Sequence, residues 1–195
     1  MVNKILAING SMRIRGNTDT LLASLLSGAR NSGILVSQYA LRDKKISDCR
    51  GCYYCYANSR CAIQDDMQEI HGDMQSSDLL LLASPLYWWG VTGLMKTFID
   101  RLYMYYPRAN TGIIAGKKAI IMTPMHVNEK EHGEGAFRSE IEPVMMTYSY
   151  ILKRLGVDIV DMMFFPGLTN KGDAKKNKKY MNSTYKIGEG LRTLK

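Results

Sequence analysis

The sequence predicts an α/β fold, a three-layer sandwich in which helices cover both faces of a five-stranded parallel sheet. Short apolar runs alternate along the chain with segments whose apolar residues recur at helical spacing, and the connections between them are short. Strands buried on both faces read as continuous apolar runs, and strands that alternate with helices form parallel sheets. The 195 residues, 46% of them hydrophobic, suit a single domain over residues 1–195.

The first strand is expected at Lys4–Asn9, an apolar run that ends at Gly10. A helix follows, for which Thr18 is the expected N-cap, and Gly28 and Gly33 are expected to end it. The apolar stripe of this helix comprises Leu21, Leu22, Leu25 and Leu26.

The middle of the chain continues the alternation. β-Branched and aromatic residues over 34–41 predict the second strand, and Leu79–Ala83 predicts the third. Between them Asp65-Asp66-Met67 opens a short helix that directs Met67, Ile70 and Met74 to the core. Thr92 is the expected cap of the next helix, whose inward residues are Leu94, Phe98, Ile99 and Leu102.

The second half of the chain supplies the last two strands, at Lys118–Thr123 and at residues 157–165. A long helix that Gly156 ends lies between them, with an inward stripe of Phe137, Ile141, Met145, Tyr148 and Leu152. Residues 173–191 predict a final helix with an inward stripe of Tyr180, Thr184, Ile187 and Leu191. Ligands of open parallel sheets bind beyond the carboxyl ends of the strands, so the loops there are the candidate site.

The loop Gly10–Thr18 after the first strand has the composition of a phosphate site. It offers two glycines, two arginines, and hydroxyl and amide side chains just before a helix N-terminus, where backbone N–H groups and the helix dipole favour an anion. It lacks the closing Gly-Lys-Ser/Thr of a Walker motif and the Gly-x-Gly-x-x-Gly of dinucleotide folds, so a mononucleotide fits better. A plain strand-to-helix turn with a good cap is the alternative.

Four stretches, taken in chain order, resemble the flavodoxin-like family of NADPH-dependent FMN reductases and, more narrowly, the iron–sulfur flavoproteins. They are Gly10-Ser11-x-Arg13 with Gly16-Asn17-Thr18, the four-cysteine segment ending in Asp65-Asp66-Met67, Ser84-Pro85-Leu86-Tyr87 with Gly90, and Lys96–Arg101. This resemblance covers most of residues 4–101 and implies a flavodoxin-like sandwich that binds FMN. It assigns the FMN phosphate to the first loop, through Ser11, Arg13, Gly16, Asn17 and Thr18.

The loop Ser84–Gly90 after the third strand places both tryptophans of the chain beside a tyrosine. A flat isoalloxazine ring needs apolar or aromatic walls, and Gly90 permits close backbone approach. The resemblance assigns this loop to the ring, through Pro85, Leu86, Tyr87, Trp88, Trp89 and Gly90. It also brings the loop after the fourth strand to the other side of the flavin, where Thr123 and His126 are candidate contacts. Buried packing or a subunit interface is the alternative for the aromatic residues.

All four cysteines fall between positions 49 and 61, with the spacing Cys49-x2-Cys52-x2-Cys55-x5-Cys61. Four thiols so close together, with no export signal evident, favour metal binding or redox chemistry over structural disulfides. Compact runs of this kind hold cubane iron–sulfur clusters, and the spacing is near that of the iron–sulfur flavoproteins. The cysteines are therefore candidate ligands of a [4Fe–4S] cluster, with free or reversibly oxidised thiols and zinc as the alternatives.

Charge and hydropathy limit which partners and which cellular location we expect. The net charge is +8, but no aromatic residues interleave with the late lysines, which predicts a solvated helix face and no nucleic-acid partner. These lysines are Lys171, Lys175, Lys176, Lys178 and Lys179. No apolar run approaches the roughly 20 residues of a membrane span, and we expect a cytoplasmic protein that does not enter a membrane.

If FMN is bound, the flavin performs the chemistry and no catalytic side chain is required. The leading hypothesis is an FMN-dependent oxidoreductase that passes electrons between NAD(P)H or ferredoxin and an acceptor that the sequence leaves open. The alternative is a flavin electron carrier without a substrate of its own, which docks to a redox partner through its positive surface. The resemblance also implies a homodimer or a homotetramer.

Overall fold

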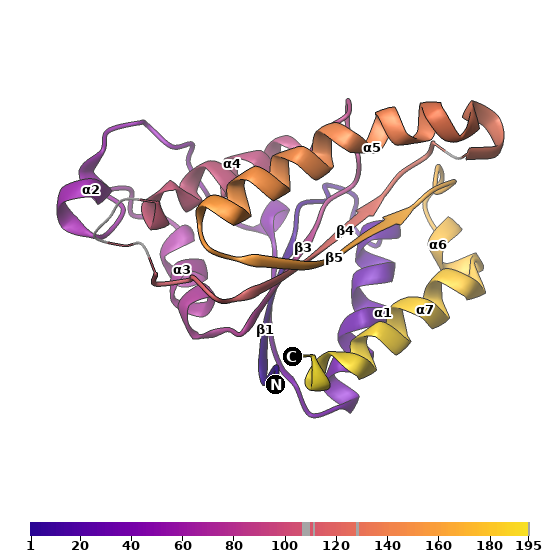
Figure 1. Cartoon of the computed structure of the whole chain (residues 1–195), viewed down its shortest axis with the longest axis horizontal. Coiled ribbons are helices and arrows are strands. Elements are labelled where there is room, and N and C mark those ends of the chain that lie inside the picture. Colours follow the sequence, from indigo (N-terminus) through magenta and orange to yellow (C-terminus); the bar gives the residue numbers. More distant parts are fainter. Residues whose placement is uncertain (107–109, 111, 128, 195) are drawn as a thin grey trace.

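Five strands form the centre of the computed structural model, which describes residues 1–106, 110, 112–127 and 129–194 (Figure 1). The strands are β1 (Lys4–Asn9), β2 (Leu35–Ala40), β3 (Leu79–Ala83), β4 (Lys118–Pro124) and β5 (Asp158–Phe165). They form one sheet of order β2-β1-β3-β4-β5, in which every neighbouring pair is parallel. The predicted α/β class with a five-stranded parallel sheet is confirmed.

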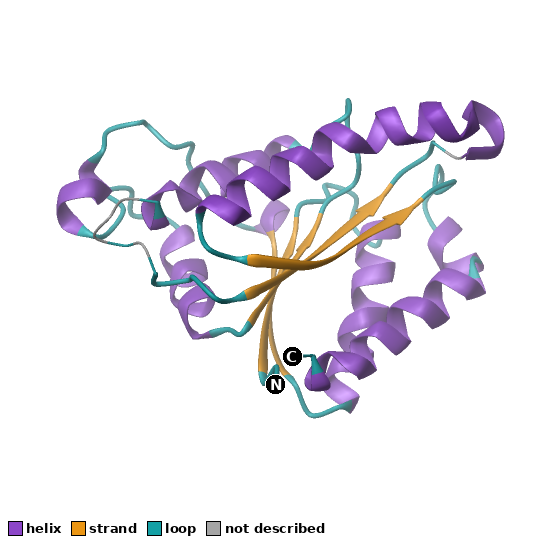
Figure 2. Cartoon of the chain, viewed as in Figure 1, coloured by secondary structure: helices purple, strands orange, loops and turns teal. Residues whose placement is uncertain are grey.

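Helices cover both faces of this sheet, as Figure 2 shows. On one face lie α1 (Asn17–Asn31), α6 (Asp173–Lys176) and α7 (Lys178–Gly190), and on the other lie α3 (Met67–Ser76), α4 (Gly93–Arg101) and α5 (Glu129–Arg154). The short helix α2 (Tyr54–Asn58) belongs to the cysteine segment, which projects from one end of the sandwich (Figure 1). Within the described residues the chain also forms three 3-10 turns, η1 (Leu41–Asp43), η2 (Leu102–Tyr105) and η3 (Leu191–Thr193).

The sheet separates two apolar cores because successive strand residues point to opposite faces. In β1, Leu6 and Ile8 join the core under α3, α4 and α5, whereas Ile5 and Ala7 join the core under α1 and α7. Every residue of the central strand β3 is buried. A strand buried on both faces is apolar throughout, which is why the sequence located β1 and β3 correctly.

The start and end of α1 differ from the prediction. Gly16 is its N-cap and makes no side-chain capping bond, so Thr18 is not the cap and lies instead in the buried part of the first turn. Gly28 does not end the helix, which continues to Asn31 before Gly33 turns the chain at φ +76°. A Cβ at Gly28 would collide with the carbonyl oxygen of Tyr185, so this glycine allows α7 to cross α1 closely.

The helices of the second half also depart from the prediction in part. α5 begins at Glu129, several residues before the first residue of the predicted inward stripe. The prediction that Met145 points inward is wrong, because Met145 is exposed and the neighbouring Val144 is buried instead. Residues 173–191 form two helices, since the Asn177 side chain accepts a hydrogen bond from the Tyr180 N–H (3.1 Å) and caps α7. Among the described helices, none is both long and apolar enough to span a bilayer.

Candidate functional site

A narrow polar crevice lies at the carboxyl ends of the strands, where the loops after β1, β3, β4 and β5 meet. Its volume is about 100 Å³, and its lining residues are Ser11, Arg13, Asn17, Thr18, Pro85, Leu86, Tyr87, Pro124, Met125, His126, Leu168 and Thr169. A wider aromatic hollow of about 490 Å³ is lined by Leu86, Tyr87, Trp88, Trp89, His126, Val127 and Glu140. Three residues line both, so the crevice and the hollow adjoin and together form one candidate site with a polar end and an aromatic end.

The loop Gly10–Thr18 folds on itself at the polar end of the crevice. The Ser11 hydroxyl accepts a hydrogen bond from the Arg13 N–H (3.2 Å), and the Gly16 N–H donates to the Arg13 carbonyl (3.1 Å). Since Gly16 provides no side-chain cap to α1, the N–H groups of the first helical turn remain available to a ligand. Such N–H groups, together with the positive end of the helix dipole, favour an anion.

Asp19 lies in this same turn, but its negative charge is compensated. Its carboxylate accepts hydrogen bonds from Asn9 Nδ2 (2.6 Å), the Arg15 N–H (2.7 Å) and Arg42 Nη1 (3.0 Å). Arg42 also donates to the Ser11 carbonyl (3.0 Å), so one half-buried ion pair shapes the loop. Sequence reasoning missed Arg42, because the residue follows β2 and reaches the loop only through the sheet.

The side chain of Asn17 is committed to the loop after β5. Its Nδ2 donates to the carbonyls of Leu168 (3.3 Å) and Asn170 (2.9 Å), and its Oδ1 accepts from the Ala174 N–H (3.1 Å). A ligand at this end would therefore meet the Asn17 backbone N–H and not its amide. Arg13 is exposed and donates to the Thr169 carbonyl (3.2 Å), and its other guanidinium nitrogens have no hydrogen-bond partner among the described residues.

Sequence reasoning also missed the contribution of Leu168 and Thr169 to the crevice. Their position directly after the last strand was the available signal, since ligands gather beyond the carboxyl ends of parallel strands. Glu140 of α5 was missed as well, and nothing local marks it as a lining residue of the aromatic hollow.

The aromatic end is built on a tight two-residue turn. Tyr87 and Gly90 exchange both backbone hydrogen bonds at 3.0 Å, and Trp88 and Trp89 between them adopt left-handed backbone angles, with φ of +45° and +57°. This conformation is strained for residues other than glycine. Trp88 is 89% exposed, and the two indole rings lie 5.4 Å apart. The turn thus holds two large rings at the mouth of the site.

The two candidates from the loop after β4 occupy different places. His126 is exposed and lines both the crevice and the aromatic hollow. Thr123 is outside both linings, and its buried hydroxyl has no hydrogen-bond partner among the described residues. Strand alternation puts Thr123 on the same sheet face as Ile121, under α4 and α5.

The four cysteines line a separate small cavity of about 40 Å³, which we call the cysteine hollow. Cys49 and Cys52 are exposed, Cys55 and Cys61 are half-buried, and all four are free thiols. Burial raises the pKa of the Cys55 thiol, and the charges of Cys61, Cys52 and Cys49 raise it further. In the described part of the chain, no three His, Cys, Asp or Glu side chains converge as they would around a single metal ion.

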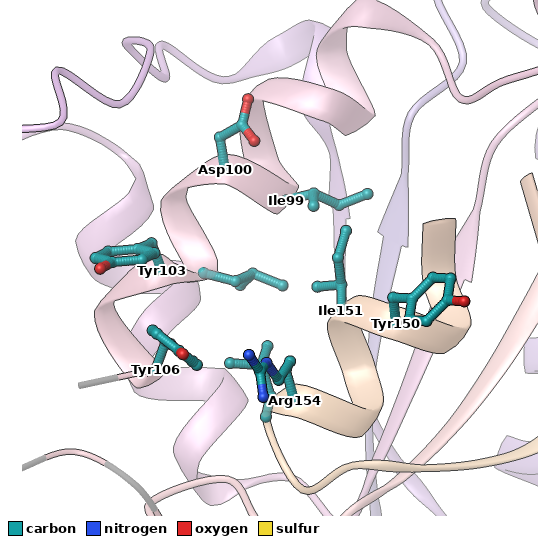
Figure 3. Close-up of a pocket in the computed structure, with 9 residues that line it drawn as sticks. Ile99, Asp100, Tyr103, Tyr106, Tyr150, Ile151 and Arg154 are labelled. Carbon is teal, nitrogen blue, oxygen red and sulfur yellow. The ribbon is translucent and has the colours of Figure 1, made fainter. Parts of the chain in front are cut away.

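A third hollow, of about 340 Å³, lies between α4, η2 and α5 (Figure 3). Tyr103 and Tyr106 stand on one side of it and Ile151 and Arg154 on the other, with the Arg154 guanidinium 5.5 Å from the centre of the Tyr106 ring. Its walls are mainly apolar and it lies away from the strand ends. The crevice and the cysteine hollow therefore remain the candidate sites.

Comparisons with known proteins agree with this geometry. The model of the family described as NADPH-dependent FMN reductase matches residues 3–134. An iron–sulfur flavoprotein from Archaeoglobus fulgidus is 42% identical over 102 residues, which cover 52% of this chain and 46% of that protein. Another from Methanocaldococcus jannaschii is 37% identical over 98 residues, covering 50% and 51%. The matched segment thus spans about half the length of these curated relatives.

The solved structures add a likeness of fold. A NAD(P)H:quinone oxidoreductase from Methanothermobacter marburgensis superposes with a TM-score of 0.77 over 98% of this chain and 100% of that one, at 16% identity. At this level of identity the likeness concerns the fold alone, and it confirms the flavodoxin-like arrangement that the sequence predicted.

Proposed function

The chain belongs to the NADPH-dependent FMN reductase family, and we propose that it is an FMN-dependent oxidoreductase that passes electrons between NAD(P)H or ferredoxin and an acceptor. The observation that carries this proposal is that the narrow polar crevice adjoins the aromatic hollow. FMN has the matching shape, with a phosphate at one end and a flat ring at the other. Bound there, the flavin would supply the electron-transfer chemistry.

The polar end suits the phosphate for three reasons. The first turn of α1 lacks a side-chain cap, Arg42 neutralises the nearby Asp19 carboxylate, and Arg13 places a positive charge beside the opening. Ser11 and Thr18 add hydroxyl groups to the lining. In this arrangement the backbone N–H groups bind the phosphate, and Arg13 compensates its charge.

The aromatic end suits the isoalloxazine ring. Leu86 and Tyr87 line the junction between crevice and hollow, so they would contact the ring where it meets the ribityl chain. Trp89, 46% exposed, and the more exposed Trp88 form the outer wall and would exclude water from one side of the ring. His126, which also lines both spaces, is placed to hydrogen-bond a polar ring atom.

A flavin titration tests the binding site. FMN fluorescence is followed as apoprotein is added, and the double variant Ser11→Ala/Arg13→Ala is compared with the wild type. We expect the double variant to bind FMN at least tenfold more weakly, because it loses a charge-assisted contact worth about 1.5–3 kcal/mol. Arg15→Ala is the matched control, since Arg15 belongs to the same loop but does not line the crevice. Equal affinity of the double variant and the wild type would refute the phosphate assignment.

Reduction of the bound flavin distinguishes the enzyme from its alternative. Anaerobic addition of NADPH should bleach the flavin absorbance rapidly if the chain is an NAD(P)H-dependent oxidoreductase. A flavin that stays oxidised with NADPH and NADH, but is reduced through ferredoxin with a strong dependence on salt, would favour an electron carrier that docks through charge.

The cysteine hollow is the second part of the proposal. Four thiols that line one cavity fit a [4Fe–4S] cluster by donor type, because such clusters are held by four cysteine thiolates. The residues that would hold it are Cys49, Cys52, Cys55 and Cys61. Anaerobic reconstitution should yield about four iron and four sulfide per chain if this holds. Protein that retains neither element would refute the cluster and leave free or reversibly oxidised thiols.

Location and assembly extend the proposal. We place the protein in the cytoplasm as a single-domain homodimer or homotetramer without a nucleic-acid partner. Sedimentation of the FMN-loaded protein measures the assembly state, and a purely monomeric species at micromolar concentration would contradict it.

A further inference from the structure

Arg101 is 2% exposed although it lies at the end of α4, next to the exposed cysteine segment. Its Nη1 donates to the Ser47 carbonyl (2.8 Å) and to Asp65 Oδ2 (2.7 Å). Its Nη2 donates to Asp65 Oδ1 (3.2 Å), to Cys61 Sγ (3.4 Å) and to the Ile63 carbonyl (3.4 Å). One guanidinium therefore contacts the chain just before the first cysteine and again around the last.

The two ends of the cysteine segment are also bonded to each other. The Ser47 N–H donates to Asp65 Oδ2 (2.9 Å), and the Lys45 N–H donates to Asp66 Oδ2 (2.7 Å). The Asp66 N–H returns a bond to the Lys45 carbonyl (3.2 Å). We call this paired base, Lys45–Ser47 with Asp65–Asp66, the neck. Arg101 packs across the neck and fastens it to α4.

Beyond the neck the segment touches the sandwich at separate points, such as the hydrogen bond from the Thr97 hydroxyl to Asp48 (2.7 Å) and the Tyr53 ring 6.0 Å from that of Tyr103. Cys49 and Cys52 are exposed, and Tyr53 and Ser59 on either side of α2 take left-handed backbone angles with φ of +53° and +52°. The thiols nevertheless line one hollow, and Arg101 lines it with them. The neck thus closes the base of the segment on which the four sulfur atoms are gathered.

We propose that Arg101 is a positioning residue for the four-thiol site: it keeps the neck closed and directs an N–H donor at the Cys61 sulfur, which makes a cluster bound there easier to reduce. The second half of this statement rests on the cluster proposed above. Reduction adds one negative charge to a cluster, and hydrogen bonds to the cluster sulfurs favour the more negative state. A charged donor does so more strongly than a neutral one.

Two variants distinguish a positioning role of Arg101 from a general contribution to the stability of the fold. Arg101→Lys keeps the positive charge beside Asp65 but cannot form the planar fork that reaches Ser47 and Cys61 together. Arg101→Met/Asp65→Asn removes both charges of the buried pair, so no carboxylate is left buried and unpaired. Lys96→Met is the matched control on α4, because it removes an exposed lysine whose ion pair with Asp100 lies outside the neck.

The first measurement needs no cluster. In apoprotein, alkylation of each cysteine is timed by mass spectrometry under native conditions. We expect the Cys61 rate to rise several-fold in Arg101→Lys and in the double variant, and to stay at the wild-type rate in Lys96→Met. Unchanged Cys61 rates in both Arg101 variants, with folded protein by circular dichroism, would overturn the positioning role.

The second measurement is the midpoint potential of the reconstituted cluster, followed by electron paramagnetic resonance during dithionite titration. We expect the potential to fall in the order wild type, Arg101→Lys, double variant, with Lys96→Met equal to the wild type. Equal potentials in all four proteins would overturn the electronic part, because a merely structural arginine would alter iron retention without altering the potential. Wild-type protein that assembles no cluster would refute the cluster itself, while the alkylation rates would still decide the positioning role.

Discussion

His71 should make the protein sensitive to acid, and the size of the effect follows from its surroundings. The side chain lies in α3 with 3% exposure, and its Nδ1 is 2.9 Å from the Tyr105 hydroxyl. Its Nε2 has no partner among the described residues. Burial, together with the charge of Arg101 and against the opposing charge of Asp65, lowers the pKa of His71 from 6.5 to about 4. The folded protein therefore keeps a neutral imidazole where the unfolded chain binds a proton.

The difference between the two pKa values corresponds to roughly 3 kcal/mol, because each pKa unit is worth about 1.4 kcal/mol. Above pH 6.5 neither state is protonated at this site, so the residue leaves the free energy of unfolding unchanged. As the pH falls from 6.5 to about 4, the unfolded state alone gains the proton and the free energy of unfolding decreases. Below about pH 4 both states are protonated and the loss stops.

The variant His71→Gln isolates this contribution. The glutamine amide can either accept a hydrogen bond from the Tyr105 hydroxyl or donate one to it, and it does not titrate. Urea unfolding followed by circular dichroism gives the free energy of unfolding of both proteins between about pH 7.5 and pH 4.5. We expect the wild type to lose roughly 2.5 kcal/mol more than the variant over this range, which stops just above the folded pKa. Carboxylates such as Asp65 titrate in both proteins and cancel in the comparison. A difference that stays constant with pH would refute the assignment.

Three further predictions concern packing, capping and ligand binding. Gly28→Ala should lower the free energy of unfolding by about 3 kcal/mol or more, because the added Cβ collides with the backbone of α7. Gly190→Ala is the control: its Cβ meets nothing within 4 Å, so this variant should unfold at nearly the wild-type temperature. Thr92→Ala should cost about 1–2 kcal/mol in urea unfolding, since Thr92 caps α4, and Thr92→Ser should restore most of it. FMN at a hundredfold excess over its Kd should stabilise the wild type by about 2.7 kcal/mol in a thermal scan, and the same FMN concentration should stabilise Ser11→Ala/Arg13→Ala less.

The features that the sequence predicted correctly are those that local chemistry decides. The apolar run of β3 ends where predicted, and Thr92 caps α4 by accepting a hydrogen bond from the Met95 N–H (3.2 Å). Both depend on residues within a few positions of each other. The start of α1 does not depend on neighbouring residues alone, since Asn17 and Thr18 are both suitable caps by residue type. Contacts of Asn17 with the loop after β5 fix the local backbone, and Gly16 becomes the cap.

The candidate site shows the same division. The loops after β1 and β3 could be identified because each carries its phosphate-binding or aromatic residues in one stretch of chain. Arg42 reaches the phosphate loop only after the sheet has assembled, so no pattern in the sequence marked it, and the one signal for Thr169 was its position directly after the last strand. Arg101 belongs to the stretch Lys96–Arg101 that resembles the reductase family. Its contact with Cys61 joins residues forty positions apart, so the sequence did not predict that contact.

Helix α4 explains why the two candidate cofactor sites depend on each other. At its start, the Thr92 hydroxyl donates to the carbonyl of Gly10 (2.7 Å), which begins the phosphate loop. At its end, Arg101 holds the neck of the cysteine segment. The nine residues of α4 place these two anchors about 13 Å apart along the helix axis, given a rise of roughly 1.5 Å per residue. Because this short helix is fixed at both ends, loosening the cap at Thr92 should weaken FMN binding and also speed alkylation of Cys61.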